Sequence, residues 1–128
     1  MNKILIAGGF LLFIPALVSA STHPTGTYVS KNFRIDNMSA VYTPSLLADH
    51  FDLIGILYNI GNNTYSNVSL EAQLFDQKSK LIDVETGSPV FSTFFPGGIS
   101  GYKIPAKVNA SDFHHYVIQV GGSNRTIQ

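Results

Sequence analysis

The chain has 128 residues, enough for one domain of ordinary size. Eight basic residues balance eight acidic ones, and charged residues make up only 12% of the chain, so it lacks the clustered cations that bind nucleic-acid phosphates. The absence of cysteine excludes disulfides, thiolate zinc sites, iron–sulfur clusters and a cysteine nucleophile. We therefore expect a single domain, held together by its apolar core, that binds no nucleic acid.

Residues 1–20 have the composition of a secretory signal peptide. Lys3 precedes an almost wholly apolar run, residues 4–18, and small residues end this segment at Ala20. The order predicts a signal-peptide helix, cleavage after Ala20, and a protein that is secreted or lies at the extracytoplasmic cell surface. The alternative is an uncleaved N-terminal membrane anchor, although about 15 apolar residues span only about 22 Å of a hydrocarbon core about 30 Å thick.

The remaining chain predicts an all-β domain. Residues 21–33 are rich in Thr, Ser, Pro and Gly and indicate a tether or an irregular first strand. Beyond them, short apolar runs alternate with turn residues and no helical period is sustained. Strands are predicted over residues 34–42, 51–60, 68–74, 81–86, 100–104 and 115–120.

Six or seven short strands without a helix predict an immunoglobulin-like antiparallel β-sandwich over residues 34–121, followed by a tail at 122–128. The run 51–60 is apolar on both faces, as in a central strand covered on two sides. Turn residues separate the strands: Asn59 and Asp76 are expected to bond the backbone that follows them and close two of the turns.

The stretch from Phe51 to Tyr102 resembles the FxLYD family of small extracytoplasmic domains. Gly55 and the run 59–61 (NIG) are similar to the family's G-x-v-x-N-x-G pattern, and residues 72–76 (AQLFD) align with the naming motif. Leu74 and Asp76 match that motif literally, and the segment 95–98 (FPGG) stands at the family's l-x-P-G turn. The resemblance implies an exported sandwich without a common catalytic site.

Five Asn-x-Ser/Thr triplets fit the acceptor pattern for N-linked sugars. They predict a glycoprotein in a host that has the pathway; the alternative is that Asn, Ser and Thr simply share the same turns. The candidate acceptors are Asn37, Asn62, Asn67, Asn109 and Asn124.

The histidines are the residues to weigh for a metal site. Adjacent residues of a strand point to opposite faces, so His114 and His115 are not expected to chelate one ion together. His50, at the start of another strand, would have to join one of them to bind copper or zinc. No Gly-x-Ser-x-Gly elbow surrounds a serine, and no phosphate-binding loop is present. We therefore predict no enzyme, no catalytic residue and no cofactor.

Exposed aromatic side chains are the remaining indication of function. Phe91, Phe94 and Phe95 fall within five positions, so at least one of them points away from a single core face. With Tyr65 they are the candidate contacts for a partner, unless they seal the open end of the sandwich.

The sequence thus predicts a non-enzymatic interaction or structural module, for example an accessory subunit of a surface assembly. Its partner would be a protein of the envelope or cell surface, and it would contact a membrane only if the leader is uncleaved. The alternative is an extracytoplasmic copper or zinc carrier that uses His50 with His114 or His115.

Overall fold

The computed structural model describes residues 24–125, so the predicted leader, residues 1–20, lies outside the described residues. Within this range the chain forms seven strands and no helix, and accordingly no helix long and apolar enough to cross a membrane. The strands are β2 (Thr25–Val29), β3 (Phe33–Thr43), β4 (His50–Asn59), β5 (Thr64–Phe75), β6 (Leu81–Pro89), β7 (Ile99–Ala106) and β8 (His115–Arg125).

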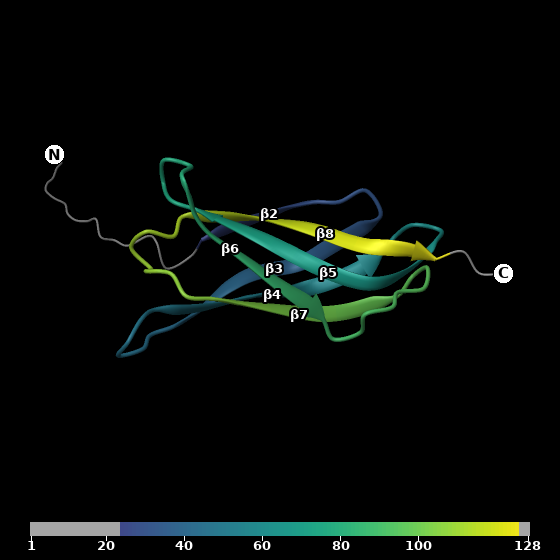
Figure 1. The fold of residues 1–128 in the computed structure, drawn as a ribbon, viewed down its shortest axis with the longest axis horizontal. Coiled ribbons are helices and arrows are strands. Elements are labelled where there is room, and N and C mark those ends of the chain that lie inside the picture. The colour runs from purple at the N-terminus through teal and green to yellow at the C-terminus, as the bar shows by residue number, and fades with distance from the viewer. Residues whose placement is uncertain (1–23, 126–128) are drawn as a thin grey trace, which may run out of the picture.

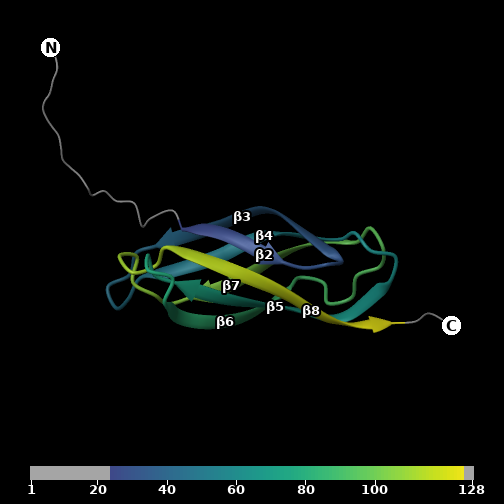
Figure 2. The ribbon, with the colours of Figure 1, turned by 90° about the horizontal axis from the view of Figure 1, so that it is seen from above.

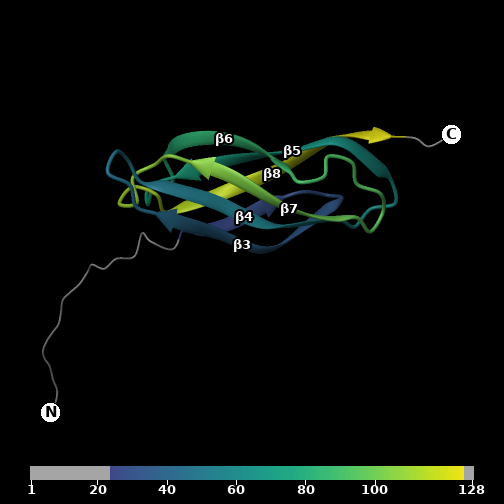
Figure 3. The same cartoon turned by 90° about the horizontal axis from the view of Figure 1, so that it is seen from below.

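The strands form two packed layers (Figure 1). One layer has the order β2-β8-β5-β6 and the other β7-β4-β3, and they are joined where Ser88 and Pro89 at the end of β6 pair with β7. β2 and β3 are the two free edges, and they lie next to each other (Figures 2 and 3). The predicted all-β sandwich is confirmed, with β2 running parallel to β8 and the other pairs antiparallel.

The strand order differs in detail from that of an immunoglobulin constant domain, which places its second and third strands in opposite layers. Here the corresponding strands, β3 and β4, are hairpin neighbours in one layer. All six predicted strands are present, and β2 occupies part of the segment for which a tether or first strand was expected. The tail was predicted to begin at residue 122, which is too early. Strand β8 continues to Arg125, which pairs with Thr64 at the start of β5.

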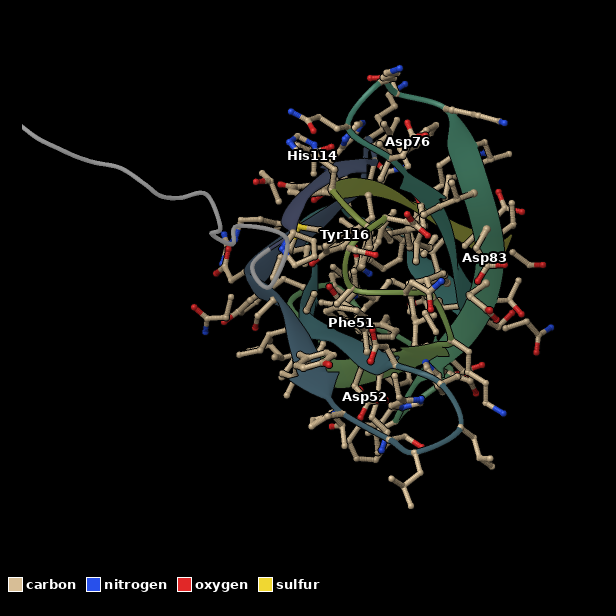
Figure 4. All side chains as sticks on the ribbon, turned by 90° about the vertical axis from the view of Figure 1, so that its left-hand side faces the viewer. Phe51, Asp52, Asp76, Asp83, His114 and Tyr116 are labelled. Atoms are coloured by element: carbon tan, nitrogen blue, oxygen red, sulfur yellow. The ribbon has the colours of Figure 1, made fainter. Side chains whose placement is uncertain are left out.

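The core lies between the two layers. Phe51 packs edge-on against Phe113 at 5.0 Å between ring centroids, and Phe113 contacts Tyr116 at 5.8 Å. Figure 4, seen from the end at which β8 begins, shows Phe51 and Tyr116 pointing into the interior. In β4, Leu53 and Leu57 are buried with Phe51. The opposite face of β4 is only half-buried, because no second layer covers it, so the expectation of a strand covered on both sides is wrong.

Two turns are closed by side chains, as predicted. The Asp76 carboxylate accepts hydrogen bonds from the backbone N–H groups of Lys78 and Lys80, both at 2.9 Å. These bonds, that from Lys80 foremost, hold the pKa of Asp76 below its usual value. At the other end of the molecule, Asn59 Oδ1 accepts a bond from the Gly61 N–H at 3.0 Å.

Two glycines allow tyrosine rings to lie flat against the backbone inside the core. The ring of Tyr116 covers Gly26 of β2, and the ring of Tyr102 covers Gly55 of β4, each so closely that a Cβ would come within 2.4 Å of the ring system. The hydroxyls of both tyrosines are buried and find no hydrogen-bond partner among the described residues. Burial raises the pKa of Tyr116 to about 12. The pKa of Tyr102 is raised further, chiefly by burial and then by the charge of Tyr116.

These shifts predict that the protein loses stability at alkaline pH. In the unfolded chain Tyr102 and Tyr116 ionise near their usual pKa of 10.0, whereas the folded protein keeps them protonated. The stabilisation is complete below pH 10 and is lost as the pH rises, because only the unfolded state then releases protons. Urea-unfolding midpoints measured from pH 8 to 11.5 should fall above pH 10. A Tyr102→Phe/Tyr116→Phe variant should show a much smaller fall, and a midpoint that stays constant in the wild type would contradict the prediction.

Candidate functional site

The connection between β6 and β7 carries the exposed aromatic residues, and Asn59 holds it in place. The Asn59 side chain is 1% exposed, and its Nδ2 donates to the carbonyl oxygens of Asn63 at 2.8 Å and Phe94 at 3.2 Å. The backbone of Asn59 adds two bonds: its N–H donates to Gly98 O at 2.9 Å, and its carbonyl accepts from Gly97 N at 3.0 Å. One buried side chain at the end of β4 therefore fixes two loops.

The same connection also pairs with β5. Tyr65 and Phe94 exchange two backbone hydrogen bonds of 3.0 and 2.8 Å, and the Val68 N–H donates to Ser92 O at 3.1 Å. This docking turns the Phe94 ring inward, where it meets the Phe33 ring edge-on at 5.7 Å between centroids. The Tyr65 ring lies 5.2 Å from the same Phe33 ring. Phe94 is 2% and Tyr65 8% exposed. The prediction that these two contact a partner is corrected, because both belong to the core.

Phe91 and Phe95 are the exposed members of the predicted group, at 64% and 61% of their surface. Three further apolar residues at this end of the molecule, which the sequence analysis did not single out, are also exposed. We call the set the aromatic rim: Ile60, Val90, Phe91, Phe95 and Ile99.

The aromatic rim continues onto the outer face of the β7-β4-β3 layer. The Val90 N–H donates to Gly101 O at 3.0 Å, so Val90 extends the pairing of β6 with β7. Across β7, Ile99 lies opposite Tyr58 and Gly101 opposite Ile56. Tyr58 and Ile56 are half-buried on the outer face, and the Arg34 guanidinium lies 4.3 Å from the centre of the Tyr58 ring. An apolar strip bordered by one cation thus leads away from the rim.

The glycosylation candidates with described side chains are all exposed. They are Asn37, Asn62, Asn67 and Asn109, while the side chain of Asn124 lies outside the described part of the structure.

Two of these asparagines have a structural reason for their residue type. Asn37 and Asn67 occupy register shifts in β3 and β5, with φ angles of 56° and 52°. Asparagine adopts this left-handed conformation more readily than most residues, so a β-bulge explains it without a sugar.

The histidines lie in both layers. His50 Nε2 is 2.9 Å from Asp52 Oδ1 in β4. His114 and His115 lie at the start of β8, with their Nδ1 atoms 3.0 Å apart. The expectation that these rings point to opposite faces is wrong, because His114 precedes the strand and does not alternate with it. Figure 4 shows His114 and Asp52 on opposite sides of the molecule. Among residues 24–125, no three His, Cys, Asp or Glu side chains are grouped to hold a metal ion.

No family model matches the chain, and neither does any curated protein. A solved structure to which it is similar is an uncharacterized β-sandwich protein from Clostridium difficile 630. The two are 8% identical, and the match covers 82% of this chain and 99% of the other with a TM-score of 0.34. The β-sandwich architecture is shown by the strands themselves, and membership of the FxLYD family stays a prediction.

Proposed function

We propose that this protein is an exported, non-enzymatic interaction module of the FxLYD type that binds a protein partner at the cell surface or in the envelope. The observation that carries the proposal is the aromatic rim: two phenylalanine rings, each more than half exposed, stand on a loop that is bonded to both β4 and β5. Exposed aromatic residues on a rigid support are typical anchors of protein interfaces.

Two features of the aromatic rim support binding to an apolar pocket of a partner. First, the rim loop, residues 90–98 between β6 and β7, is held by Asn59 and by the pairing of Phe94 with Tyr65. Little conformational entropy is therefore lost when a partner binds it. Second, Val90 and Ile99 extend the apolar area beside Phe91 and Phe95 beyond what isolated surface residues provide. A partner with an apolar groove could therefore bury several neighbouring side chains at once.

The proposal restricts where sugars can be attached. Asn62 lies in the turn fixed by Asn59, and Asn67 precedes Val68, whose N–H is bonded to the rim loop. A glycan at either position would crowd the aromatic rim, whereas Asn109 lies at the other end of the sandwich. Asn37, in the middle of β3, lies away from both ends, so we propose glycosylation there and free side chains at the two positions beside the rim.

Removing both exposed rings should abolish partner binding. We expect Phe91→Ser/Phe95→Ser to lower recovery of the partner from native envelope extracts by tenfold or more, since each buried aromatic anchor contributes on the order of 1–2 kcal/mol. The measurement is quantitative affinity recovery with the full chain as bait. The matched control is Leu81→Ser/Val84→Ser, which removes two side chains exposed to 48% and 45% on β6. Equal recovery with the two double variants would overturn the proposal.

A further inference from the structure

The hairpin between β3 and β4 ends in two leucines that contact almost nothing. Leu46 is 105% and Leu47 96% exposed, more than any other large apolar side chain among the described residues. All side chains from Thr43 to Ala48 are exposed, and the sequence has no charged residue between Asp36 and Asp49. The tip, defined as residues 44–48, is therefore an uncharged apolar projection.

The base of this hairpin is fixed by one carboxylate. Asp49 Oδ1 accepts a hydrogen bond from the Tyr42 hydroxyl at 2.9 Å, and Asp49 Oδ2 accepts one from the Ala110 N–H at 2.8 Å. These bonds tie β3 and the loop between β7 and β8 to Asp49, the residue that follows the tip. At the tip itself, the Leu47 N–H donates to Ser45 Oγ at 3.3 Å, which bends the chain locally. The leucines are thus held away from the body of the sandwich.

We propose that this tip is a membrane-contacting element whose two leucines enter the interfacial region of a lipid bilayer. A convex, uncharged, apolar projection fits a soft surface that can close around it, and leucine side chains partition well into the boundary between headgroups and acyl chains. The hydroxyls of Thr43, just before the tip, and of Ser45, near its beginning, would remain at headgroup level.

The place where the chain enters the described fold supports a bilayer as the occupant. Thr25 pairs with His115 at the start of β8, which lies at the same end of the sandwich as the hairpin tip (Figure 1). The 23 residues before Pro24 include the apolar run 4–18. Residues 19–24 can span at most about 20 Å. In the protein with an uncleaved leader, the alternative to cleavage after Ala20, a membrane that holds the apolar run would therefore face this end. The aromatic rim at the opposite end would point away from it.

Tethering makes a weak contact effective. Each leucine that leaves water adds a factor of about tenfold or more to the binding constant. Two leucines alone give a transient contact with the membrane. A tether raises the local concentration of membrane surface, so the contact persists and orients the domain relative to the bilayer. The inference is independent of the proposed partner at the rim, since the two surfaces share no residue.

Fluorescent labelling of the full chain tests the inference, because the chain has no native cysteine. A polarity-sensitive dye on Leu47→Cys is compared with the same dye on Phe91→Cys, at the opposite end, with vesicles of phosphatidylcholine and phosphatidylglycerol. In vesicle-bound protein the label at position 47 should shift to shorter wavelength and be quenched by shallow spin-labelled lipid, while the label at 91 keeps its aqueous spectrum. Adding Leu46→Ser to the Leu47→Cys variant should lower about tenfold the fraction of the label at position 47 that is inserted into lipid.

Three outcomes would overturn it. They are failure of the full chain to bind vesicles, an aqueous spectrum at position 47 in vesicle-bound protein, and equal shifts at both positions. A shift at position 47 that depends on protein concentration without vesicles would assign the tip to self-association instead. None of these results bears on the rim variants, so the failure of one proposal leaves the other standing.

Discussion

Replacing Asn59 with alanine is expected to lower the free energy of unfolding by about 3 kcal/mol, since it removes three hydrogen bonds worth about 1 kcal/mol each. The lost bonds are those from Nδ2 to Asn63 O and Phe94 O and that from the Gly61 N–H to Oδ1. Asn59 is almost wholly buried, so the groups it leaves behind have poor access to water. The substitution should therefore rank among the most destabilising single changes at this end of the molecule.

The Asn59→Ala variant should also loosen the aromatic rim before the whole domain unfolds. Urea unfolding gives the global loss, and native-state hydrogen exchange of the Phe94 and Gly97 amides reports the loop. Asn62→Ala is the matched control, because Asn62 is exposed in the same turn and should change the free energy of unfolding by less than about 0.5 kcal/mol. A loss below 1 kcal/mol with unchanged exchange at Phe94 would show that the backbone bonds alone hold the loop.

The sequence was sufficient to predict the local part of this arrangement. An Asn two residues before a Gly predicts a side chain that bonds the following turn, and the structure shows that bond. The bond from Asn59 to Phe94 joins residues 35 positions apart, so no local sequence pattern predicts it. The same long-range pairing decides which phenylalanine is buried. The spacing of the three phenylalanines requires that at least one ring points outward. Only the pairing of Phe94 with Tyr65 decides that Phe94 is buried and that Phe91 and Phe95 are exposed.

Other features escaped the sequence analysis for related reasons. The outer face of β4 was expected to be covered, since apolar residues on both faces of a strand usually indicate two covering layers. Ile56 and Tyr58 instead form part of a half-exposed strip beside the aromatic rim. Similarly, Leu46 and Leu47 carry no periodic pattern, and only the position of their hairpin shows that both are free of the core.

The fit of Tyr102 against Gly55 leads to the second large effect. Gly55→Ala is expected to lower the free energy of unfolding by about 2–3 kcal/mol, the range for forcing an extra carbon into a packed core. A Cβ on Gly55 would lie 2.4 Å from the Tyr102 hydroxyl oxygen and 2.7 Å from ring carbons. The ring is 4% exposed and therefore has little room to swing away.

Gly101 provides a matched control in the neighbouring strand β7. A Cβ there would meet only the Gly55 carbonyl oxygen, at the ordinary distance of 3.8 Å, so Gly101→Ala should change stability by less than about 0.5 kcal/mol. If both alanine variants were equally stable, backbone entropy would outweigh the clash.

A double-mutant cycle separates the clash from any general intolerance of β4. Tyr102→Leu alone should destabilise the protein because it leaves a cavity. In the double variant the new methyl group of Gly55→Ala fills part of that space, so the double variant should be at least 1 kcal/mol more stable than the sum of the single effects predicts. Additive losses would show that Gly55 is needed for a reason other than the ring. A favourable coupling would establish that the tyrosine ring occupies the space left by the glycine opposite it in the neighbouring strand of the same layer. Gly26 and Tyr116 repeat this arrangement between β2 and β8 of the other layer.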